Sequence, residues 1–470
     1  MKALSPPVDA VFDFTQTRRR LGHLQRPWQT YQIDVAGAFL LADSGSSFYQ
    51  IDSARRGRAL SSSVRFCCDT TFAIVDYGED APKKLTLADR RGFLYDLSAL
   101  TPVFLLKDFL KHDPQKSFLR YVEGSVDSVV YRADDGRIIA IAIDPDVAEA
   151  RSITMLYSVD LYGDVVTTTI FSDYHLADAG EFVYPSRIVE RALGFDANVT
   201  SVGPGRRPFD RDRVMAMIPA TYQLGEERPK PAEEILRIDY NEHIHLIDMK
   251  QANTRSLVVE FRDFLLVAEA PLNTRNGEMI ISEARKIAPD KPIRYFLFGH
   301  HHPHYIGGIR AFVHKGAIIL VTPSDSAYAR QLSEFRHSLE PDSLEREPRP
   351  LRLELVQGER VISDGEIEMR IIHIGSMSKH TEDYLIYYFP AYKLLFQGDL
   401  VWIRNDAPSA AAGPMQRGVY EAIMVHKLDV DVIMQSWMVS SAMMKTTIGF
   451  DELQESVEQW RKEEGEQRGE

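Results

Sequence analysis

The first 220 or so residues alternate between short apolar runs and turn signals. Alternating or β-branched segments, separated by turns such as Asp134-Asp135-Gly136, predict strands. One helical candidate, Val103–His112, interrupts the series. The predicted strands are Tyr31–Phe39, Val64–Tyr77, Val126–Tyr131, Arg137–Ile143, Ser152–Leu161 and Asp164–Phe171. The pattern therefore predicts an amino-terminal, mostly antiparallel β-rich domain over residues 1–224.

A polar stretch, Gly225–Glu234, separates this region from one with a different periodicity. It holds two prolines and dense charge, which is typical of a linker. Beyond it, apolar strand runs such as Leu257–Ala268 alternate with helical spacing such as Gly277–Ala288. Further predicted elements are a helix from Ile306 and the strands Arg294–Phe298, Ala317–Val321, Glu368–Ile374, Asp383–Tyr388 and Leu394–Phe396. We expect an α/β domain over residues 235–450 and a charged helix or tail over residues 451–470.

The charge balance argues against some classes of binding partner. The 470 residues include 55 Lys and Arg against 68 Asp and Glu, a formal net charge of −13. Nucleic-acid binders usually carry a basic face, and anionic membranes attract basic segments, so the balance argues against both. No run approaches the roughly 18 apolar residues of a membrane span. We expect a small-molecule substrate, no nucleic acid and no membrane span, and the sequence predicts no oligomeric state.

Two features of the sequence indicate the cellular compartment. The amino terminus lacks the apolar core of a secretory signal. The two cysteines, Cys67 and Cys68, are adjacent and therefore poorly placed to bridge each other. A chain without a disulfide framework fits a reducing compartment. We expect a cytoplasmic protein, or a periplasmic one if a leader was removed.

The segment Gly299–Gly308 (GHHHPHYIGG) holds four imidazoles within five residues, directly after an apolar strand. Alternate side chains of an extended segment point the same way, so His300, His302 and His304 can converge on one point. Neutral imidazole is a common ligand of zinc and iron. The two glycines that close the segment let the backbone approach a neighbour closely. The segment is typical of a metal-binding loop.

Two further segments place a ligand type at the tip of a predicted strand. Ser378–Asp383 contains His380, and Phe396–Leu400 contains Asp399. Such strand tips form the edge at which α/β folds gather their chemistry. The three segments together predict a metal site at that edge.

These motifs resemble those of the metallo-β-lactamase superfamily. Its signature runs H-x-H-x-D-H-x-G-G, a G-H-T-like loop, a G-D after a strand and a final His. In the same order this chain has His300-x-His302, His380-Thr381 and Gly398-Asp399. The resemblance covers roughly residues 235–450 and implies an αββα sandwich with the metals at one edge. The strands between Leu161 and Val189 resemble the curved antiparallel sheet that some bacterial members carry ahead of this fold.

The chain departs from the family pattern at the second metal. The family's Asp is His304 here, and the His after it is Tyr305. After the predicted strand Val430–Met434, where the family has its final His, the chain has Gln435-Ser436-Trp437. The resemblance implies one zinc site with His300, His302, His380 and Asp399, and a second site only if His304 and Asp399 rebuild it.

The implied chemistry is hydrolysis. A metal held by three imidazoles with an open position lowers the pKa of bound water to about 7. We expect a metal-dependent hydrolase in which metal-bound hydroxide attacks an ester, lactone, thioester or amide of a small molecule. Asp399 would hold the metal, orient the water or accept its proton. Tyr305 would either donate to a developing oxyanion or pack against the Gly-Gly helix.

Other interpretations stay open. Two histidines with Asp399 also form the 2-His-1-carboxylate set of non-haem iron oxygenases. A non-hydrolytic lyase or a catalytically inactive metal- or ligand-binding protein could use the same fold. The remaining histidines rank lower: His243 and His245 on a polar strand face or at the pocket mouth, His301 behind the donors or at the surface, and His373 in a core.

Overall fold

The structure is a computed structural model in which the chain forms two compact units. The first comprises Met1–Gly22, Thr30–Ser158 and Val165–Pro229. The second comprises His23–Gln29, Val159–Asp164 and Lys230–Glu470. The sequence placed all of residues 1–224 in one domain, whereas the structure groups two short stretches of them with the second unit.

The structure describes most of both units. The residues it leaves undescribed are 1–9, 23, 43–44, 57–58, 69–70, 77–82, 85–91, 93–94, 96, 104, 107–108, 110–116, 123–124, 145, 148, 178–182, 209, 211, 213–215, 217–232, 408, 442 and 469–470. Most of the predicted linker Gly225–Glu234 therefore lies outside the described residues. In the predicted helix Val103–His112, the described residues Val103, Leu105, Leu106 and Phe109 are helical, and the others lie outside.

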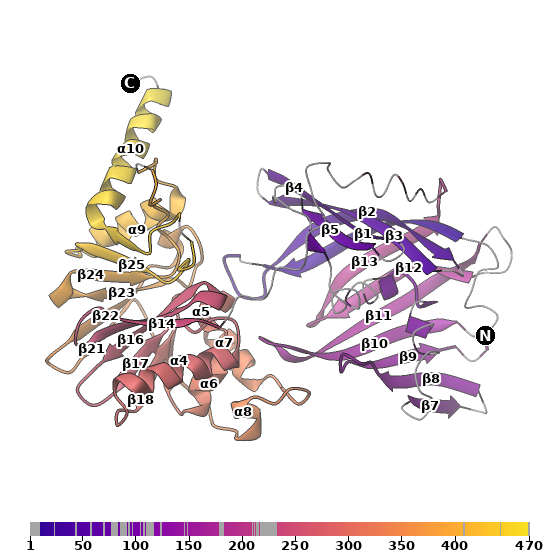
Figure 1. Cartoon of the computed structure of the whole chain (residues 1–470), viewed down its shortest axis with the longest axis horizontal. Helices are drawn as coiled ribbons and strands as arrows, with labels where there is room; N and C mark the ends of the chain where they lie inside the picture. Colours follow the sequence, from indigo (N-terminus) through magenta and orange to yellow (C-terminus); the bar gives the residue numbers. More distant parts are fainter. Residues whose placement is uncertain are drawn as a thin grey trace. The chain divides into compact units, whose positions relative to one another are not determined.

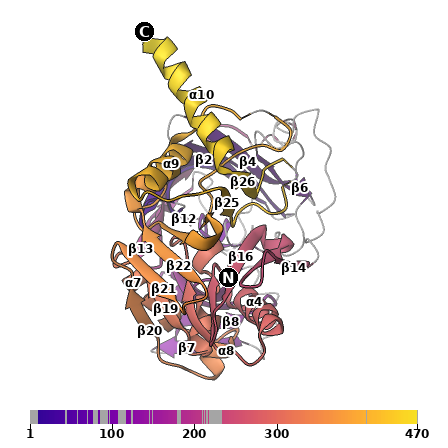
Figure 2. The ribbon, with the colours of Figure 1, turned by 90° about the vertical axis from the view of Figure 1, so that its left-hand side faces the viewer.

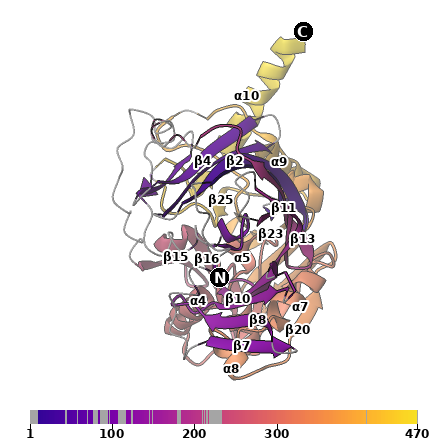
Figure 3. The same ribbon diagram turned by 90° about the vertical axis from the view of Figure 1, so that its right-hand side faces the viewer.

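The first unit is one 13-stranded sheet (Figures 1 and 3), and every strand pair whose register is described in it is antiparallel. The strand order is β6-β5-β4-β3-β2-β1-β13-β12-β11-β10-β9-β8-β7, so two meanders join where β1 pairs with β13. The strands are β1 Ala10–Leu21, β2 Thr30–Ala42, β3 Gly45–Arg56, β4 Ala59–Cys68, β5 Thr71–Asp76, β6 Lys83–Lys84, β7 Ser117–Val122, β8 Ser125–Arg132, β9 Ile138–Ile143, β10 Ala150–Val159, β11 Gly163–Leu176, β12 Val183–Ala192 and β13 Phe195–Pro204. The prediction of an antiparallel β domain ahead of the α/β region is confirmed.

One face of this sheet carries the core of the first unit. Alternate residues of a strand point to opposite faces, and Phe12 and Phe14 of β1 are buried accordingly. They join a cluster that includes Ile139 and Ile141 of β9 and Ile153 of β10, farther along the sheet. The segment around Tyr95–Leu105 packs into the same cluster.

The second unit contains two sheets, both with mixed strand directions. The seven-stranded sheet has the order β14 Ile235–Asp239, β15 Ile244–Met249, β16 Thr254–Glu260, β17 Leu265–Ala268, β18 Ile293–Leu297, β19 Ile318–Val321 and β20 Arg352–Leu355, parallel from β17 onward. The six-stranded sheet has the order β21 Glu359–Ser363, β22 Glu368–His373, β23 Leu385–Phe389, β24 Leu394–Gln397, β25 Val432–Gln435 and β26 Thr447–Gly449, with β24 and β25 parallel.

Helices connect the parallel strands and flank the sheets (Figures 1 and 2). The α-helices of this unit are α4 Thr274–Ile287, α5 Pro303–Ile306, α6 Ile309–His314, α7 Ser326–Glu334, α8 Ser343–Arg346, α9 Pro414–Val425 and α10 Phe450–Arg468. Short 3-10 helices are η3 Lys250–Ala252, η4 Gly375–Ser378 and η5 Pro390–Tyr392.

Three apolar clusters show how these layers stack. The middle cluster joins the facing sides of the two sheets, for example Leu257 with Phe396. A second joins the outer side of the seven-stranded sheet to helices α4, α6, α7 and α8, and a third joins the outer side of the six-stranded sheet to α9 and α10. The layer order is helix, sheet, sheet, helix, so the predicted αββα sandwich is confirmed.

The predicted strand Leu257–Ala268 is two strands. β16 ends at Glu260 and β17 begins at Leu265, and the backbone N–H of Phe261 donates to the carbonyl of Phe264 at 3.0 Å. Arg262 and Asp263 form the exposed turn between them. Two adjacent charged residues cannot both be accommodated in a strand that is buried on both faces, and the chain reverses there.

The charged segment after residue 450 forms helix α10. Its amino-terminal half is packed, because Leu453 and Val457 are buried in the cluster that contains α9. Its last turns extend away from the sandwich (Figure 2). In the described part of the chain, no helix combines the length and apolar character needed to cross a membrane.

Candidate metal centre

Four side chains that could hold a metal meet where strand ends of the two sheets come together. His300 and His302 follow β18 of one sheet. His380 lies between η4 and β23 of the other sheet, and Asp399 follows β24. One ligand atom from each of the four lies within 4.8 Å of all the others. The three predicted segments therefore meet at one edge of the sandwich.

The spacing of these atoms suits a metal ion. Nε2 of His300 lies 3.0 Å from Nδ1 of His302, and Nε2 of His380 lies 3.3 Å from Oδ2 of Asp399. Donors at about 2.0–2.1 Å in tetrahedral array around zinc are about 3.3 Å apart. The two histidines after β18 are almost fully buried, so their nitrogens are withdrawn from water. Three imidazoles and one carboxylate could thus coordinate one divalent ion.

Close backbone packing shapes the histidine loop. Pro303 occupies the first position of α5, where the missing N–H costs nothing. A Cβ on Gly307 would lie 2.4 Å from backbone atoms of Leu272, and one on Gly308 would lie 2.7 Å from the Cβ of Ala270. The prediction that these glycines allow close backbone approach is confirmed.

Asp399 is held as an ionised carboxylate. The Tyr384 hydroxyl donates to Oδ1 of Asp399 at 3.1 Å and accepts the backbone N–H groups of Gly398 and Asp399 at 3.0 Å. Burial works against ionisation of Asp399, but the hydrogen bond and charge of His380 keep its pKa below the ordinary value. The chain thus supplies a buried negative charge next to three imidazoles.

Tyr305 lies beneath the donors and not among them. It is 2% exposed, belongs to the apolar cluster under the seven-stranded sheet, and its ring lies 4.2 Å from that of His300. Burial and the charge of Asp399 raise its pKa well above the ordinary value, so the phenol stays protonated.

His304 does not join the four-residue group among the described residues. Its ring faces that of Trp437 at 6.2 Å, and Trp437 in turn meets Trp402 at 5.2 Å. A second site of His304 with Asp399 therefore stays a prediction.

His301 takes part in a buried group of its own. Its backbone N–H and its Nδ1 contact Oδ2 of Asp383 at 2.7 and 3.1 Å. Asp325 completes the group, and all three residues are buried. Burial and the neighbouring Asp383 raise the pKa of Asp325 to about 10. Burial also opposes ionisation of Asp383, yet hydrogen bonds from His301 and Asp325 lower its pKa, so Asp325 carries the proton.

Glu269 anchors the other side of the histidine loop. It follows β17, and its two carboxylate oxygens accept the backbone N–H of Gly299, each at 3.1 Å. The Tyr387 hydroxyl donates to it at 3.0 Å. Complete burial raises the pKa of Glu269 to about 8. The sequence did not reveal Glu269, because its only signal was an acidic residue at the end of an apolar run.

A short stretch from the first 30 residues also reaches the centre. Nε2 of His302 lies 3.2 Å from the carbonyl oxygen of Leu24, so Nε2–H donates to it and Nδ1 is left facing the donors. The backbone N–H of Glu382 donates to the carbonyl of Gln25 at 3.1 Å. These contacts connect sequence positions almost 300 residues apart or more, and no local pattern could predict them.

The lower-ranked histidines lie elsewhere in this unit. Nδ1 of His245 on β15 contacts Asp239 at 2.8 Å, and Nδ1 of His243 contacts the carbonyl of Glu260 at 3.1 Å. Nε2 of His373 contacts the carbonyl of Glu382 at 3.1 Å. Each is held by a polar partner outside the four-residue group.

The αββα layers and the position of the donors at one edge define the second unit as having the metallo-β-lactamase fold, as the resemblance predicted. The His and Asp donors make it a unit that could bind metal.

Solved metallo-β-lactamases are similar to this chain at low identity. One from Pontibacter korlensis is 12% identical with a TM-score of 0.36, and the match covers 48% of this chain and 99% of that one. The mono-zinc form of one from Pseudomonas aeruginosa is 18% identical with a TM-score of 0.36, covering 50% and 97%. One from Hirschia baltica is 17% identical with a TM-score of 0.34, covering 48% and 98%. No protein-family model and no curated protein matches the chain.

Proposed function

We propose that the protein is a metal-dependent hydrolase that cleaves an ester, lactone, thioester or amide of a small molecule. The observation that carries the proposal is the convergence of His300, His302, His380 and Asp399 within 4.8 Å. Three imidazoles form a donor set suited to a catalytic zinc ion, with the Asp399 carboxylate beside them. A divalent ion bound there supplies Lewis acidity toward a carbonyl oxygen and acidifies water.

The residues of the chain take distinct roles in this proposal. His300, His302 and His380 hold the ion. Asp399, ionised and fixed by the Tyr384 hydroxyl, orients the attacking water and accepts its proton. Tyr305 is a positioning residue, because its protonated phenol lies buried beneath His300.

A second candidate uses the same side chains. Two histidines and Asp399 form the facial set of non-haem iron enzymes that activate O₂. Nε2 of His380 and Oδ2 of Asp399 lie 3.3 Å apart, close enough for both to ligate one ion, as such enzymes require. Iron in the purified protein, with substrate-dependent consumption of O₂, would support this candidate over the hydrolase.

The first test replaces one donor. We expect His380→Ala to lose most of its bound metal, measured by mass spectrometry on untagged protein. Turnover on a panel of chromogenic esters, lactones and thioesters should fall more than about 100-fold. His243→Ala, directly before β15 and outside the donor group, is the matched control and should keep both the bound metal and the turnover.

Two outcomes would contradict the proposal. Unchanged turnover in His380→Ala would show that the reaction does not use this centre. Wild-type protein without metal after repletion, and without turnover, would show that the histidine loop does not support a metal-dependent reaction.

A further inference from the structure

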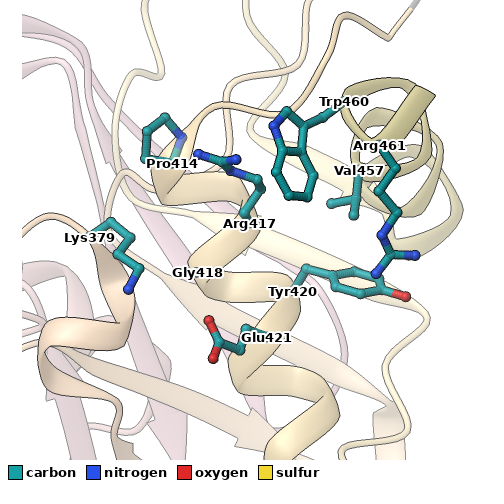
Figure 4. A pocket seen from close by; sticks show the side chains of 9 residues that line it. All are labelled: Lys379, Pro414, Arg417, Gly418, Tyr420, Glu421, Val457, Trp460 and Arg461. Atoms are coloured by element: carbon teal, nitrogen blue, oxygen red, sulfur yellow. The ribbon is translucent and has the colours of Figure 1, made fainter. Parts of the chain in front are cut away.

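A pocket in the second unit opens between helices α9 and α10 and the residue that precedes His380 (Figure 4). Its volume is about 370 Å³, within the range of about 300–1,000 Å³ typical of small-molecule sites. Its lining comes from three segments: Lys379, Pro414, Arg417, Gly418, Tyr420, Glu421, Val457, Trp460 and Arg461.

The pocket is cationic in an acidic protein. Lys379, Arg417 and Arg461 face it, against the single carboxylate of Glu421. Within the described chain, none of the three cations has a carboxylate partner within 4.0 Å. The whole chain carries a net charge of −13, so three unpaired cations around one cavity are a local reversal of sign. Such a concave patch concentrates anions from solution.

Aromatic rings hold the two arginines in place. The Arg417 guanidinium lies 4.1 Å over the ring of Trp460, and that of Arg461 lies 5.6 Å over the ring of Tyr420 (Figure 4). Tyr420 is itself stacked on Phe450 at 6.0 Å. A guanidinium that uses its face for stacking keeps the N–H groups at its edge for an oxyanion. Little side-chain entropy is then lost when the anion binds.

The floor of the pocket is closely packed. Gly418 of α9 packs so closely against η4 that a Cβ there would lie 2.1 Å from the carbonyl oxygen of Met377. Val457 of α10, which also lines the pocket, is buried. The cationic groups therefore surround a cavity with a closely packed floor, which is the arrangement that a specific ligand requires.

We propose that this pocket binds a small oxyanion with two or more negative charges, of the diphosphate or polycarboxylate kind. The three cations supply charge-assisted hydrogen bonds from separate directions, and three positive charges against one carboxylate are better balanced by an anion with two or more negative charges. The pocket does not include any of the four metal donors, although Lys379 directly precedes His380. The proposal is independent of the proposed hydrolase activity.

The test titrates inorganic pyrophosphate, and separately citrate, into the full-length protein at constant ionic strength, using calorimetry and tryptophan fluorescence. The same titrations use His300→Ala, which removes a metal donor and so excludes binding of the probe to a metal ion. We expect saturable binding of at least one probe in both proteins, weakening as salt is added. Binding of pyrophosphate alone would identify a phosphate site, citrate alone a carboxylate site, and both a general oxyanion site.

Variants locate the binding. Arg417→Gln and Arg461→Gln should each weaken binding about tenfold, as expected for one charge-assisted hydrogen bond. Arg285→Gln removes an exposed arginine from α4 and should bind like the wild type. Equal thermal unfolding temperatures of the variants would show that the fold is retained. The proposal would be overturned if neither probe bound, or if both pocket variants bound with wild-type affinity.

Discussion

Asp383 connects the two loops that carry the metal donors. It accepts the backbone N–H of His301, which lies between His300 and His302, and it sits three residues after His380. Its negative charge is maintained by His301 and by the protonated Asp325. A change at Asp383 therefore alters the placement of three donors without removing any of them.

We expect Asp383→Asn to weaken metal binding about 10–100-fold, the usual effect of losing a group that orients metal ligands. Competition with a chromophoric chelator measures the affinity. Asp290→Asn, in an exposed loop, is the control and should bind metal like the wild type. Equal affinities in all three proteins would mean that the loops are held without Asp383.

At the residue scale, the sequence could indicate the donors but not their supports. His300 and His302 were predicted to point together because the loop is extended, and the structure brings both to one point with His380 and Asp399. Glu269, Asp325 and Leu24 contact the loop only after distant segments have packed. Their roles depend on tertiary contacts, which no spacing in one sequence reveals.

At the scale of elements, one carboxylate joins three helices. Asp342 caps α8 through the backbone N–H of Glu345, forms a two-point ion pair with Arg310 of α6 at 2.6 and 3.0 Å, and accepts the Thr274 hydroxyl at the start of α4. Burial opposes ionisation, but these hydrogen bonds lower the pKa of Asp342 to about 2.

The folded pKa of Asp342 lies below its ordinary value, so its stabilising effect is present above about pH 4 and is lost as the pH falls toward 2. We expect Asp342→Asn to lower the free energy of unfolding by about 2–3 kcal/mol at pH 7, because Arg310 stays buried without its partner. The difference from wild type should shrink at pH 3. Urea unfolding at both pH values measures it, with Asp263→Asn, in an exposed turn, as control.

Strand predictions succeeded where apolar runs were short and separated by turn residues. They failed at Leu257–Ala268, where apolar residues on both sides of Arg262-Asp263 obscured a hairpin, and at Val64–Tyr77, which spans the two paired strands β4 and β5. Helix α9 was not predicted, although Val419, Ala422 and Ile423 have helical spacing and are buried. The chain between β24 and α9 is irregular, and this weakened the sequence pattern that would have indicated the helix.

At the scale of the whole molecule, two short stretches of the amino-terminal half belong to the second unit, which contains the four candidate metal donors. Trp28 from one stretch stacks on Tyr162 from the other, with ring centroids 5.6 Å apart. The Trp28 ring also makes edge-to-face contacts with Tyr328 and Phe335. Its Nε1–H donates to Gln331 at 2.5 Å. This aromatic group attaches both stretches to the neighbourhood of α7.

We expect Trp28→Ala to lower the free energy of unfolding by about 3 kcal/mol, through lost burial and ring contacts. Metal retention should fall with it, because Leu24 would no longer be held beside His302. Urea unfolding and metal analysis test both effects, with Tyr240→Ala, an exposed aromatic residue, as control. Wild-type stability in Trp28→Ala would show that the stretch is attached by other contacts.

The interleaving of these stretches restricts how such a gene can recombine. A crossover placed between residues 164 and 230 would give a chimaera whose second unit comes from two parents. Its Arg26 would be inherited from one and the Glu382 that it pairs with at 2.6 Å from the other. Recombination at that position therefore favours parents whose residues at positions 26 and 382 are compatible with each other. The two halves of the gene are expected to diverge together.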